Sequence, residues 1–326
     1  MTFLPVRFFL PFTVCIFNNI SKIKFLFTIV LVIFCLESRA QDSVDKLFNK
    51  AYYYLSVDQG KALKTLSQCI DLDSTYSDAY FHRGITYFKF GKYDSAMLDF
   101  NQVQKLSPNK SIIWMYKGFT HRNNGEIDKA LQAFSNYITL NPTDTSAYSY
   151  VLRGKMKYEL GDFDGAVEDY DMALKLKPLE EKYYYYRFVA QYDAERYKDA
   201  LTSVTELIKT NPSFYGYYFY KGNVFQGLEE YDSAIYQYNV AIIKNYQNSD
   251  SYFYRGQSYQ KKGELEKALE DYNTAIVLNS TDGTYYSHRG NVKYSIGNKE
   301  GACEDWNEAG ALGYYKDFDR IKQVCE

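Results

Sequence analysis

The sequence lacks the residues and motifs on which most catalytic and metal sites depend. Its 326 residues include only three histidines, at widely separated positions, and no His-x-x-x-His or Cys-x-x-Cys pair. Such pairs are the usual signature of bound zinc. The chain also contains no Gly-x-Ser-x-Gly turn and no Walker-type phosphate loop. We therefore expect no enzymatic activity, no catalytic residue, no metal and no cofactor.

An excess of basic residues is missing as well. Lysine and arginine together number 38, against 40 aspartates and glutamates, and the formal net charge is −2. Proteins that bind nucleic acid usually carry a basic patch and a high isoelectric point. We therefore expect no nucleic-acid partner.

The first 40 residues differ in composition from the rest of the chain. Lys22 and Lys24 precede an apolar run at residues 25–36, and the small residues Ser38 and Ala40 follow it. This order is typical of a secretory signal peptide, here with cleavage after Ala40. The apolar run is shorter than the roughly 20 residues that span a membrane. We therefore expect residues 1–40 to direct export to the periplasm or cell envelope.

Residues 1–21 fit this pattern less well, because two prolines and an arginine interrupt their apolar run. One interpretation is that translation starts further in, near Ile20. The other is that residues 1–36 form an uncleaved membrane anchor. In that case the membrane is a partner of the N-terminal segment only.

One alanine recurs at a nearly constant interval through the rest of the chain. The interval is 34 residues, except for one step of 36 between the third and fourth alanines. A fixed period of this length indicates one structural repeat that is stacked many times. We number each repeat so that this alanine stands at position 20. The eight alanines are Ala62, Ala96, Ala130, Ala166, Ala200, Ala234, Ala268 and Ala302.

Each repeat has the pattern of two helices joined by a tight turn. Apolar and small residues at positions 4, 8 and 11 fall on one helical face, and those at positions 20, 24 and 27 on another. A glycine at position 15, such as Gly91, allows the turn, and a proline at position 32, such as Pro108, stops the second helix. The small residues at positions 8 and 20 let the helices approach closely. Phe188 replaces the glycine of position 8 in one repeat, where we expect looser packing. The position-8 glycines are Gly84, Gly118, Gly154, Gly222, Gly256 and Gly290.

This period and these residues resemble the tetratricopeptide repeat. The resemblance implies an all-α fold, a right-handed α-solenoid of about eight helical hairpins with a C-terminal capping helix. The Ala-Gln ending of the signal and the composition further resemble exported bacterial proteins of the Bacteroidetes. We expect the repeats at residues 44–76, 77–110, 111–144, 147–180, 181–214, 215–248, 249–282 and 283–312, and the capping helix at 313–326.

The charged residues at positions 7 and 23 vary together. Position 7 is basic in all seven later repeats, and every repeat with aspartate at position 23 has arginine rather than lysine at position 7. Arginine suits a planar two-point contact with a carboxylate better than lysine does. Partly exposed pairs of this kind contribute about 0–1 kcal/mol each. The predicted structural pairs are Arg83–Asp99, Arg153–Asp169, Arg255–Asp271 and Arg289–Asp305.

Three cysteines lie beyond residue 40. Cys303 falls in the second helix of the last repeat, and Cys325 lies at the end of the expected cap. An exported protein can form disulfides, so these two either form a disulfide or remain two buried thiols. Cys69 falls at a core position, where we expect it to act as a small apolar residue.

The resemblance also implies a concave groove lined by the first helix of each repeat. Positions 5, 9 and 12 are apolar and aromatic in the N-terminal half of the chain and grade into Asn and Gln in the C-terminal half. This surface suits an extended peptide or a partner helix, or else some of its rings contact the next repeat. The expected groove residues are Phe81, Ile85, Phe88, Met115, Phe119, Arg122, Lys155, Tyr158, Tyr185, Tyr192, Phe219, Asn223, Gln226, Phe253, Gln257 and Gln260.

The sequence therefore predicts a non-enzymatic scaffold or adaptor of the bacterial cell envelope. It would bind a protein or peptide partner in the concave groove. The alternative is a glycan-binding or cell-wall-binding module, because sugar rings stack on aromatic side chains and the chain contains 36 tyrosines.

Overall fold

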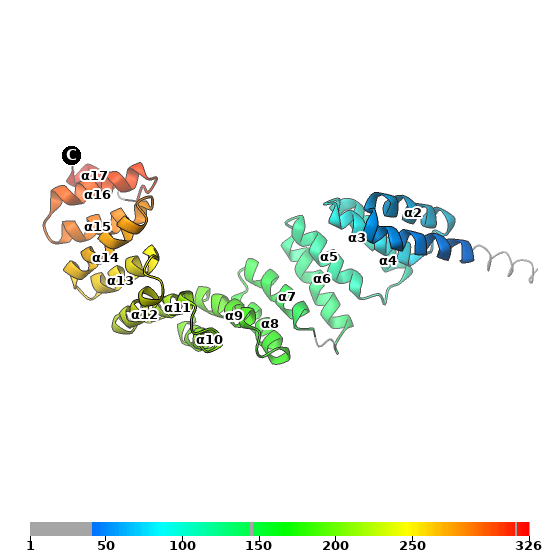
Figure 1. The fold of residues 1–326 in the computed structure, drawn as a ribbon, viewed down its shortest axis with the longest axis horizontal. Helices are drawn as coiled ribbons and strands as arrows, with labels where there is room; N and C mark the ends of the chain where they lie inside the picture. The colour runs from blue at the N-terminus through cyan, green and yellow to red at the C-terminus, as the bar shows by residue number, and fades with distance from the viewer. Residues whose placement is uncertain (1–40, 144–145, 317, 326) are drawn as a thin grey trace, which may run out of the picture. The chain divides into compact units, whose positions relative to one another are not determined.

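The computed structural model describes residues 41–143, 146–316 and 318–325, and every regular element within them is a helix (Figure 1). The predicted signal peptide or anchor, residues 1–40, lies outside the described residues. Among the described helices, none is both long and apolar enough to cross a membrane. The chain divides into two compact units, Met1–Leu140 and Asn141–Glu326. The boundary falls within the one interval of 36 residues.

Consecutive helices pair as hairpins, which confirms the predicted all-α fold of stacked helical repeats. The first unit contains a helix at residues 41–57, α2 (Gln59–Leu72), α3 (Ser77–Lys89), α4 (Tyr93–Leu106), α5 (Ile112–Asn123) and α6 (Ile127–Leu140). The second unit contains α7 (Ala147–Glu159), α8 (Phe163–Leu176), α9 (Glu181–Asp193), α10 (Tyr197–Thr210), α11 (Tyr215–Gly227), α12 (Tyr231–Lys244), α13 (Ser249–Lys261), α14 (Leu265–Leu278), α15 (Gly283–Ser295), α16 (Lys299–Ala311) and α17 (Phe318–Val324).

The C-terminal helix is shorter than the sequence suggests. Gly313 has a φ of 88°, which ends the preceding helix, and α17 begins only at Phe318. A disulfide joins Cys303 of α16 to Cys325, whose Cα atoms lie 5.7 Å apart. Of the two arrangements that the sequence left open, a disulfide or two buried thiols, the structure has the disulfide. The bond fastens the end of α17 to α16. Cys69 is a buried free thiol.

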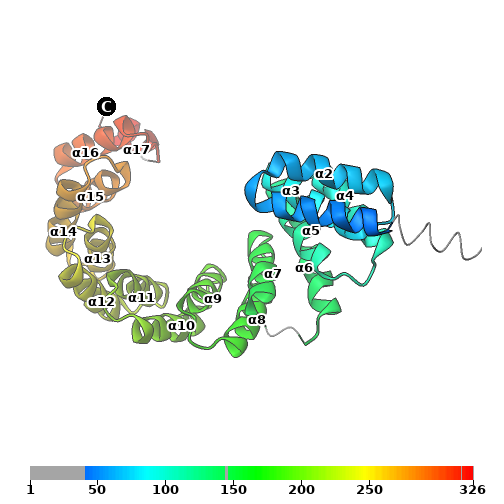
Figure 2. The same ribbon diagram turned by 45° about the vertical axis from the view of Figure 1, so that its right-hand side comes forward.

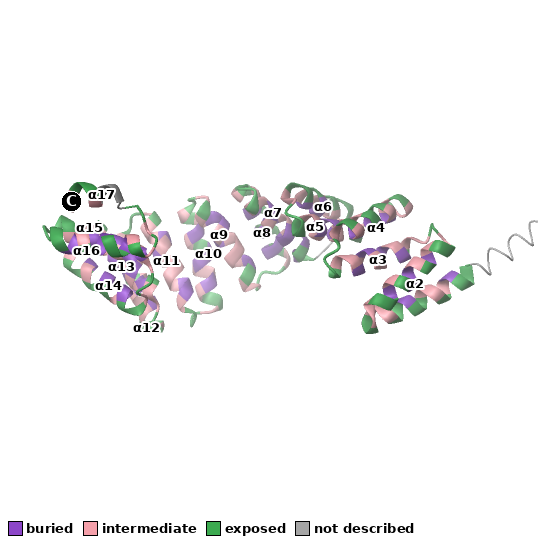
Figure 3. Ribbon diagram, turned by 90° about the horizontal axis from the view of Figure 1, so that it is seen from above, coloured by how far each residue is buried: buried purple, intermediate pink, exposed green. Residues whose placement is uncertain are grey.

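Within a repeat, the two helices approach closely because the ring at position 24 packs directly against the glycine at position 8. A Cβ added at Gly84 would lie 2.7 Å from the Phe100 ring, and one at Gly256 would lie 2.9 Å from the Tyr272 ring. No side chain is accommodated at such separations without a shift of the ring. Buried residues accordingly line the interface between paired helices (Figure 3). The buried residues at position 24 are Phe100, Phe134, Tyr170, Val204, Tyr238, Tyr272 and Trp306.

The repeat at residues 181–214 reverses this arrangement. Phe188 occupies position 8 and Val204 occupies position 24, so the large and the small residue have exchanged helices. Both are buried, and they belong to one apolar cluster with Ala200 and Leu207. An exchange that keeps the total volume is tolerated better than a gain or loss at one position. The looser packing that we expected at Phe188 is therefore offset by the smaller side chain opposite.

This exchange predicts strong coupling between the two positions. Val204→Phe alone overfills the interface and should cost about 1–3 kcal/mol. Phe188→Gly alone leaves a cavity and should cost at least about 3 kcal/mol. The double variant restores the arrangement of the other repeats and should recover most of both losses. Urea unfolding of the full chain measures the coupling, and purely additive effects would contradict the exchange.

The arginine at position 7 joins two consecutive repeats. Arg83 donates from Nε and Nη2 to the two carboxylate oxygens of Asp99, at 2.9 and 2.8 Å, and from Nη1 to Ser67 of the preceding repeat at 3.1 Å. Asp99 lies sixteen residues after the arginine and Ser67 sixteen residues before it. The sequence indicated only the contact within the repeat. The structure places the aspartate contact also at Arg153–Asp169, Arg255–Asp271 and Arg289–Asp305.

These pairs are more buried than we expected from the sequence. The side chain of Asp99 is 6% exposed and that of Arg83 is 18% exposed. The hydrogen bonds that Arg83 donates to Asp99 raise the pKa of the arginine. When one member of a buried pair is removed, the other remains as a desolvated charge without its partner, which is far more costly than loss of a surface pair.

Asp99→Ala should therefore destabilise the first unit by about 3 kcal/mol, well above the 0–1 kcal/mol typical of exposed pairs. The matched control is Asn101→Ala, an exposed position on the same helix, which should change stability by less than about 0.5 kcal/mol. Chemical denaturation followed by circular dichroism compares the two. Equal midpoints would show that the pair adds nothing to stability.

Candidate partner-binding site

Several of the predicted groove residues at position 5 are buried, and most of them contact the following repeat. Phe81, Met115 and Phe253 are buried, with 9%, 8% and 4% exposure. The Phe81 ring lies 5.5 Å from Tyr116, and the Phe253 ring 5.0 Å from His288, both at position 6 of the next repeat. The prediction that these three residues line an accessible groove is therefore wrong. Stacking of the next hairpin covers Phe81 and Phe253.

Tyr185 and Phe219 also occupy position 5, and both are half-buried. Their rings lie 6.0 Å from Tyr220 and 5.4 Å from Tyr254, respectively, again at position 6 of the next repeat. In these four repeats, those of Phe81, Tyr185, Phe219 and Phe253, position 5 thus belongs to the interface with the next repeat.

Two further predicted groove residues form hydrogen bonds to side chains of the next repeat. Lys155 donates to the hydroxyl of Tyr186, with its ammonium 4.1 Å from the centre of that ring. Tyr158 donates its hydroxyl proton to Asp193. Both contacts tie the repeat at 147–180 to its neighbour.

The remaining predicted groove residues of the first unit are apolar, apart from one exposed arginine. Ile85 and Phe88 pack beside the core around Phe100, and Phe119 lies 5.6 Å from the Phe134 ring. Arg122 is exposed.

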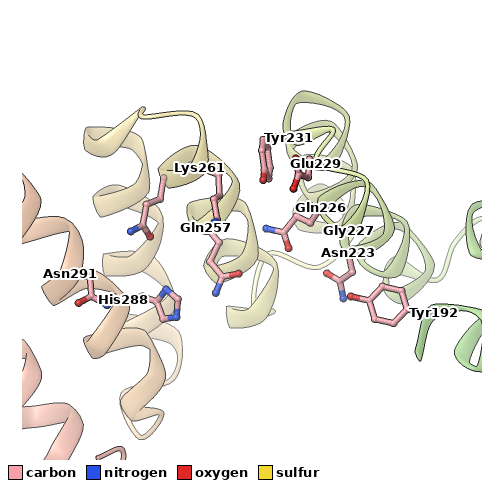
Figure 4. A pocket seen from close by; sticks show the side chains of 11 residues that line it. Tyr192, Asn223, Gln226, Gly227, Glu229, Tyr231, Gln257, Lys261, His288 and Asn291 are labelled. Atoms are coloured by element: carbon pink, nitrogen blue, oxygen red, sulfur yellow. The ribbon is translucent and has the colours of Figure 1, made fainter. Parts of the chain in front are cut away.

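In the second unit, five of the predicted groove residues meet in one pocket of about 720 Å³. The first helices α9, α11, α13 and α15 lie along the inner side of a curved row there, with α10, α12, α14 and α16 outside them (Figure 2). All four inner helices contribute side chains to the pocket (Figure 4). The predicted residues that line it are Tyr192, Asn223, Gln226, Gln257 and Gln260.

Six lining residues were not among the predicted site residues. Asn291 occupies position 9, as Asn223 does, so its place in the repeat was a usable signal. Lys261 and Gly227 both stand at position 13, directly after position 12. The other three come from positions that the repeat pattern assigns to turns or helix contacts, and they are Glu229, Tyr231 and His288.

Buried aromatic residues hold the pocket amides from below. The Tyr238 hydroxyl lies 2.7 Å from Oδ1 of Asn223 and 3.1 Å from Oε1 of Gln226. The Tyr272 hydroxyl donates to Oε1 of Gln260 at 2.7 Å. Burial raises the pKa of both tyrosines well above the ordinary value, so both hydroxyls keep their protons at neutral pH. The amide oxygens are thereby turned toward the core.

The amide nitrogens are less fully used. Gln226 donates from Nε2 to the carbonyl oxygen of Tyr254 at 3.0 Å and to Ser258 at 2.9 Å. Within the described residues, Nδ2 of Asn223, Nε2 of Gln260 and the whole Gln257 amide have no hydrogen-bond partner. Each N–H of such an amide is a donor. The pocket therefore offers more donors than acceptors to an occupant.

Charged and aromatic groups flank these amides. Glu229 and Lys261 are exposed and form no salt bridge among the described residues. Burial raises the pKa of Tyr192 to about 12, which keeps its hydroxyl a neutral donor. No group of three or more His, Cys, Asp or Glu side chains in the described part of the chain is arranged to hold a metal ion. The chemistry of the pocket is thus hydrogen bonding by neutral groups with one charge of each sign nearby.

Comparisons with known proteins agree with this architecture. Sequence profiles of the tetratricopeptide repeat match residues 77–110, 151–212, 185–250 and 249–282. No curated protein matches the sequence.

Two solved structures share the fold. The C-terminal part of a TPR repeat-containing protein from Cytophaga hutchinsonii superposes with a TM-score of 0.62 at 18% identity, covering 73% of this chain and 97% of that one. A tetratricopeptide repeat protein from Parabacteroides merdae gives a TM-score of 0.55 at 19% identity, covering 76% and 96%. Because the profile matches span more than half of the chain and the hairpins follow the same period, this protein belongs to the tetratricopeptide repeat family.

Proposed function

We propose that this protein is a non-enzymatic scaffold that holds a protein partner in the amide-lined pocket of its second unit. The observation that carries this proposal is the set of side-chain amides that project from three consecutive first helices, α11, α13 and α15, into one cavity. A row of neutral donors with aromatic neighbours suits a polypeptide, which presents a carbonyl oxygen at every residue. The family to which the chain belongs generally binds protein or peptide partners.

Site-specific photocrosslinking in cells tests this proposal. A photoreactive amino acid at Gln257, inside the pocket, should form a covalent adduct with one discrete protein. The matched control is the same amino acid at Gln247, an exposed residue in the turn after α12, which should give no such adduct. An adduct that glycosidases remove but proteases do not would favour the glycan-binding alternative, and identical adducts at both positions would refute the pocket assignment.

We further propose that the scaffold acts in the cell envelope. The support is the basic, apolar and small-residue order of residues 22–40. N-terminal sequencing of the protein recovered from the periplasmic or envelope fraction of a Gram-negative host should begin at Gln41. A protein that keeps residues 22–36 and sediments with membranes would support the anchored alternative, and a cytoplasmic protein with an intact N-terminus would contradict export.

A further inference from the structure

The amides of the concave side occur together with particular residues at position 24. In the repeats from residue 77 onward, an amide at position 9 or 12 occurs only where position 24 carries a polar tip. The three repeats of this kind combine Tyr238 with Asn223 and Gln226, Tyr272 with Gln257 and Gln260, and Trp306 with Asn291. Where position 24 is Phe or Val, positions 9 and 12 carry no amide, as at Phe100, Phe134 and Val204.

The structure gives this covariation a physical reason. Tyr238, Tyr272 and Trp306 are fully buried, so their polar hydrogens have no access to water. A buried polar group that lacks a hydrogen-bond partner is costly. The amide oxygens supply these partners, and Trp306 Nε1 donates to Oδ1 of Asn291 at 3.2 Å. Because indole nitrogen is only a donor, this contact also fixes which end of the amide faces inward.

In Asn223 and Gln260, the contact that fixes the amide oxygen inward leaves the amide nitrogen facing the pocket. We propose that Tyr238 and Tyr272 are positioning residues, which hold Asn223 and Gln260 as outward donors to the main-chain carbonyls of an extended polypeptide segment. This inference rests on the proposed function and specifies its partner. Neither tyrosine touches the partner directly.

An extended segment fits these donors better than a helix does. In a helix the main-chain carbonyls already accept hydrogen bonds from residues four positions later, apart from those of the last turn. An extended segment leaves its carbonyls open along its whole length. Recognition through the main chain also implies tolerance of different side chains, with Glu229 and Lys261 adding a preference for charge at particular positions.

The binding experiment uses a phage-displayed pool of random linear 12-residue peptides and the full chain. Peptides selected on the wild-type protein should lose about fivefold in affinity for Tyr238→Phe and for Tyr272→Phe, as expected for one hydrogen bond each. Phenylalanine occurs naturally at position 24 in Phe100 and Phe134, so both variants should fold. The matched control is Tyr170→Phe, at the same buried position of a repeat that has no amide at position 9 or 12, and its affinity should be unchanged.

Two modifications of the selected peptides test whether the donors bind the main-chain carbonyls of an extended peptide. Single amide-to-ester replacements, which weaken one carbonyl acceptor, should reduce affinity at specific positions even where alanine scanning has no effect. The same peptides cross-linked into helices should bind at least tenfold more weakly. Equal binding of the helical forms, loss of affinity only on side-chain replacement, or a pool with no enriched peptide would each overturn the inference.

A measurement without ligand separates the positioning role from the proposed function. In nuclear magnetic resonance spectra, the side-chain NH₂ signals of Asn223 and Gln260 should be dispersed in the wild type. They should collapse toward averaged positions in Tyr238→Phe and Tyr272→Phe, respectively. Unchanged signals would refute positioning even if crosslinking at Gln257 still captures a protein. Collapsed signals with no adduct at Gln257 would instead refute the proposed function.

Discussion

The ring at position 24, seated against the glycine at position 8, is the contact on which the rest of this structure depends. It sets the separation of the two helices in the six hairpins that have glycine at position 8, because a Cβ there would collide with the ring. Where this ring is Tyr238, Tyr272 or Trp306, its polar tip also donates to an amide oxygen at position 9 or 12 of the same repeat. A single packing contact thus links the stability of the hairpin to the chemistry of the concave surface.

A second contact fixes one repeat to the next. Arginine at position 7 binds aspartate within its own repeat, and in several repeats it also reaches the preceding one, as Arg289 does with Asn273 at 2.7 Å. Where position 7 is lysine, the acid at position 23 is absent. In one such repeat, position 7 is Lys117 and position 23 is Ala133. Lys117 donates to Gln104 instead. Burial lowers the pKa of Lys117. Lysine has no planar fork with which to bind two oxygens at once, so the covariation follows from side-chain geometry.

Together these contacts explain how neutral side chains can form a specific site on a thin solenoid. Amides on flexible stems lose conformational freedom when they bind a partner. Here the buried tyrosines hold the oxygens of Asn223 and Gln260 before any partner arrives. The clamp between Arg255 and Asn239, at 2.5 Å, holds α12 and α13 together beneath the pocket. Preorganisation of this kind raises affinity by reducing the ordering that binding requires.

The sequence by itself determined the repeat, its hairpin form, the arginine–aspartate partners and the amides at positions 9 and 12 of the later repeats. Each of these depends on periodicity or on covariation between repeats, which is visible without coordinates. Only the tertiary structure decided that Phe81 and Phe253 are covered, because burial at position 5 depends on where the next hairpin lies. Likewise, only the structure brought His288, Tyr231 and Glu229 to the pocket, since residues from turns and from neighbouring repeats converge there through stacking. The period of a solenoid is a local property of the chain, whereas the faces left open to a partner result from the way successive hairpins pack.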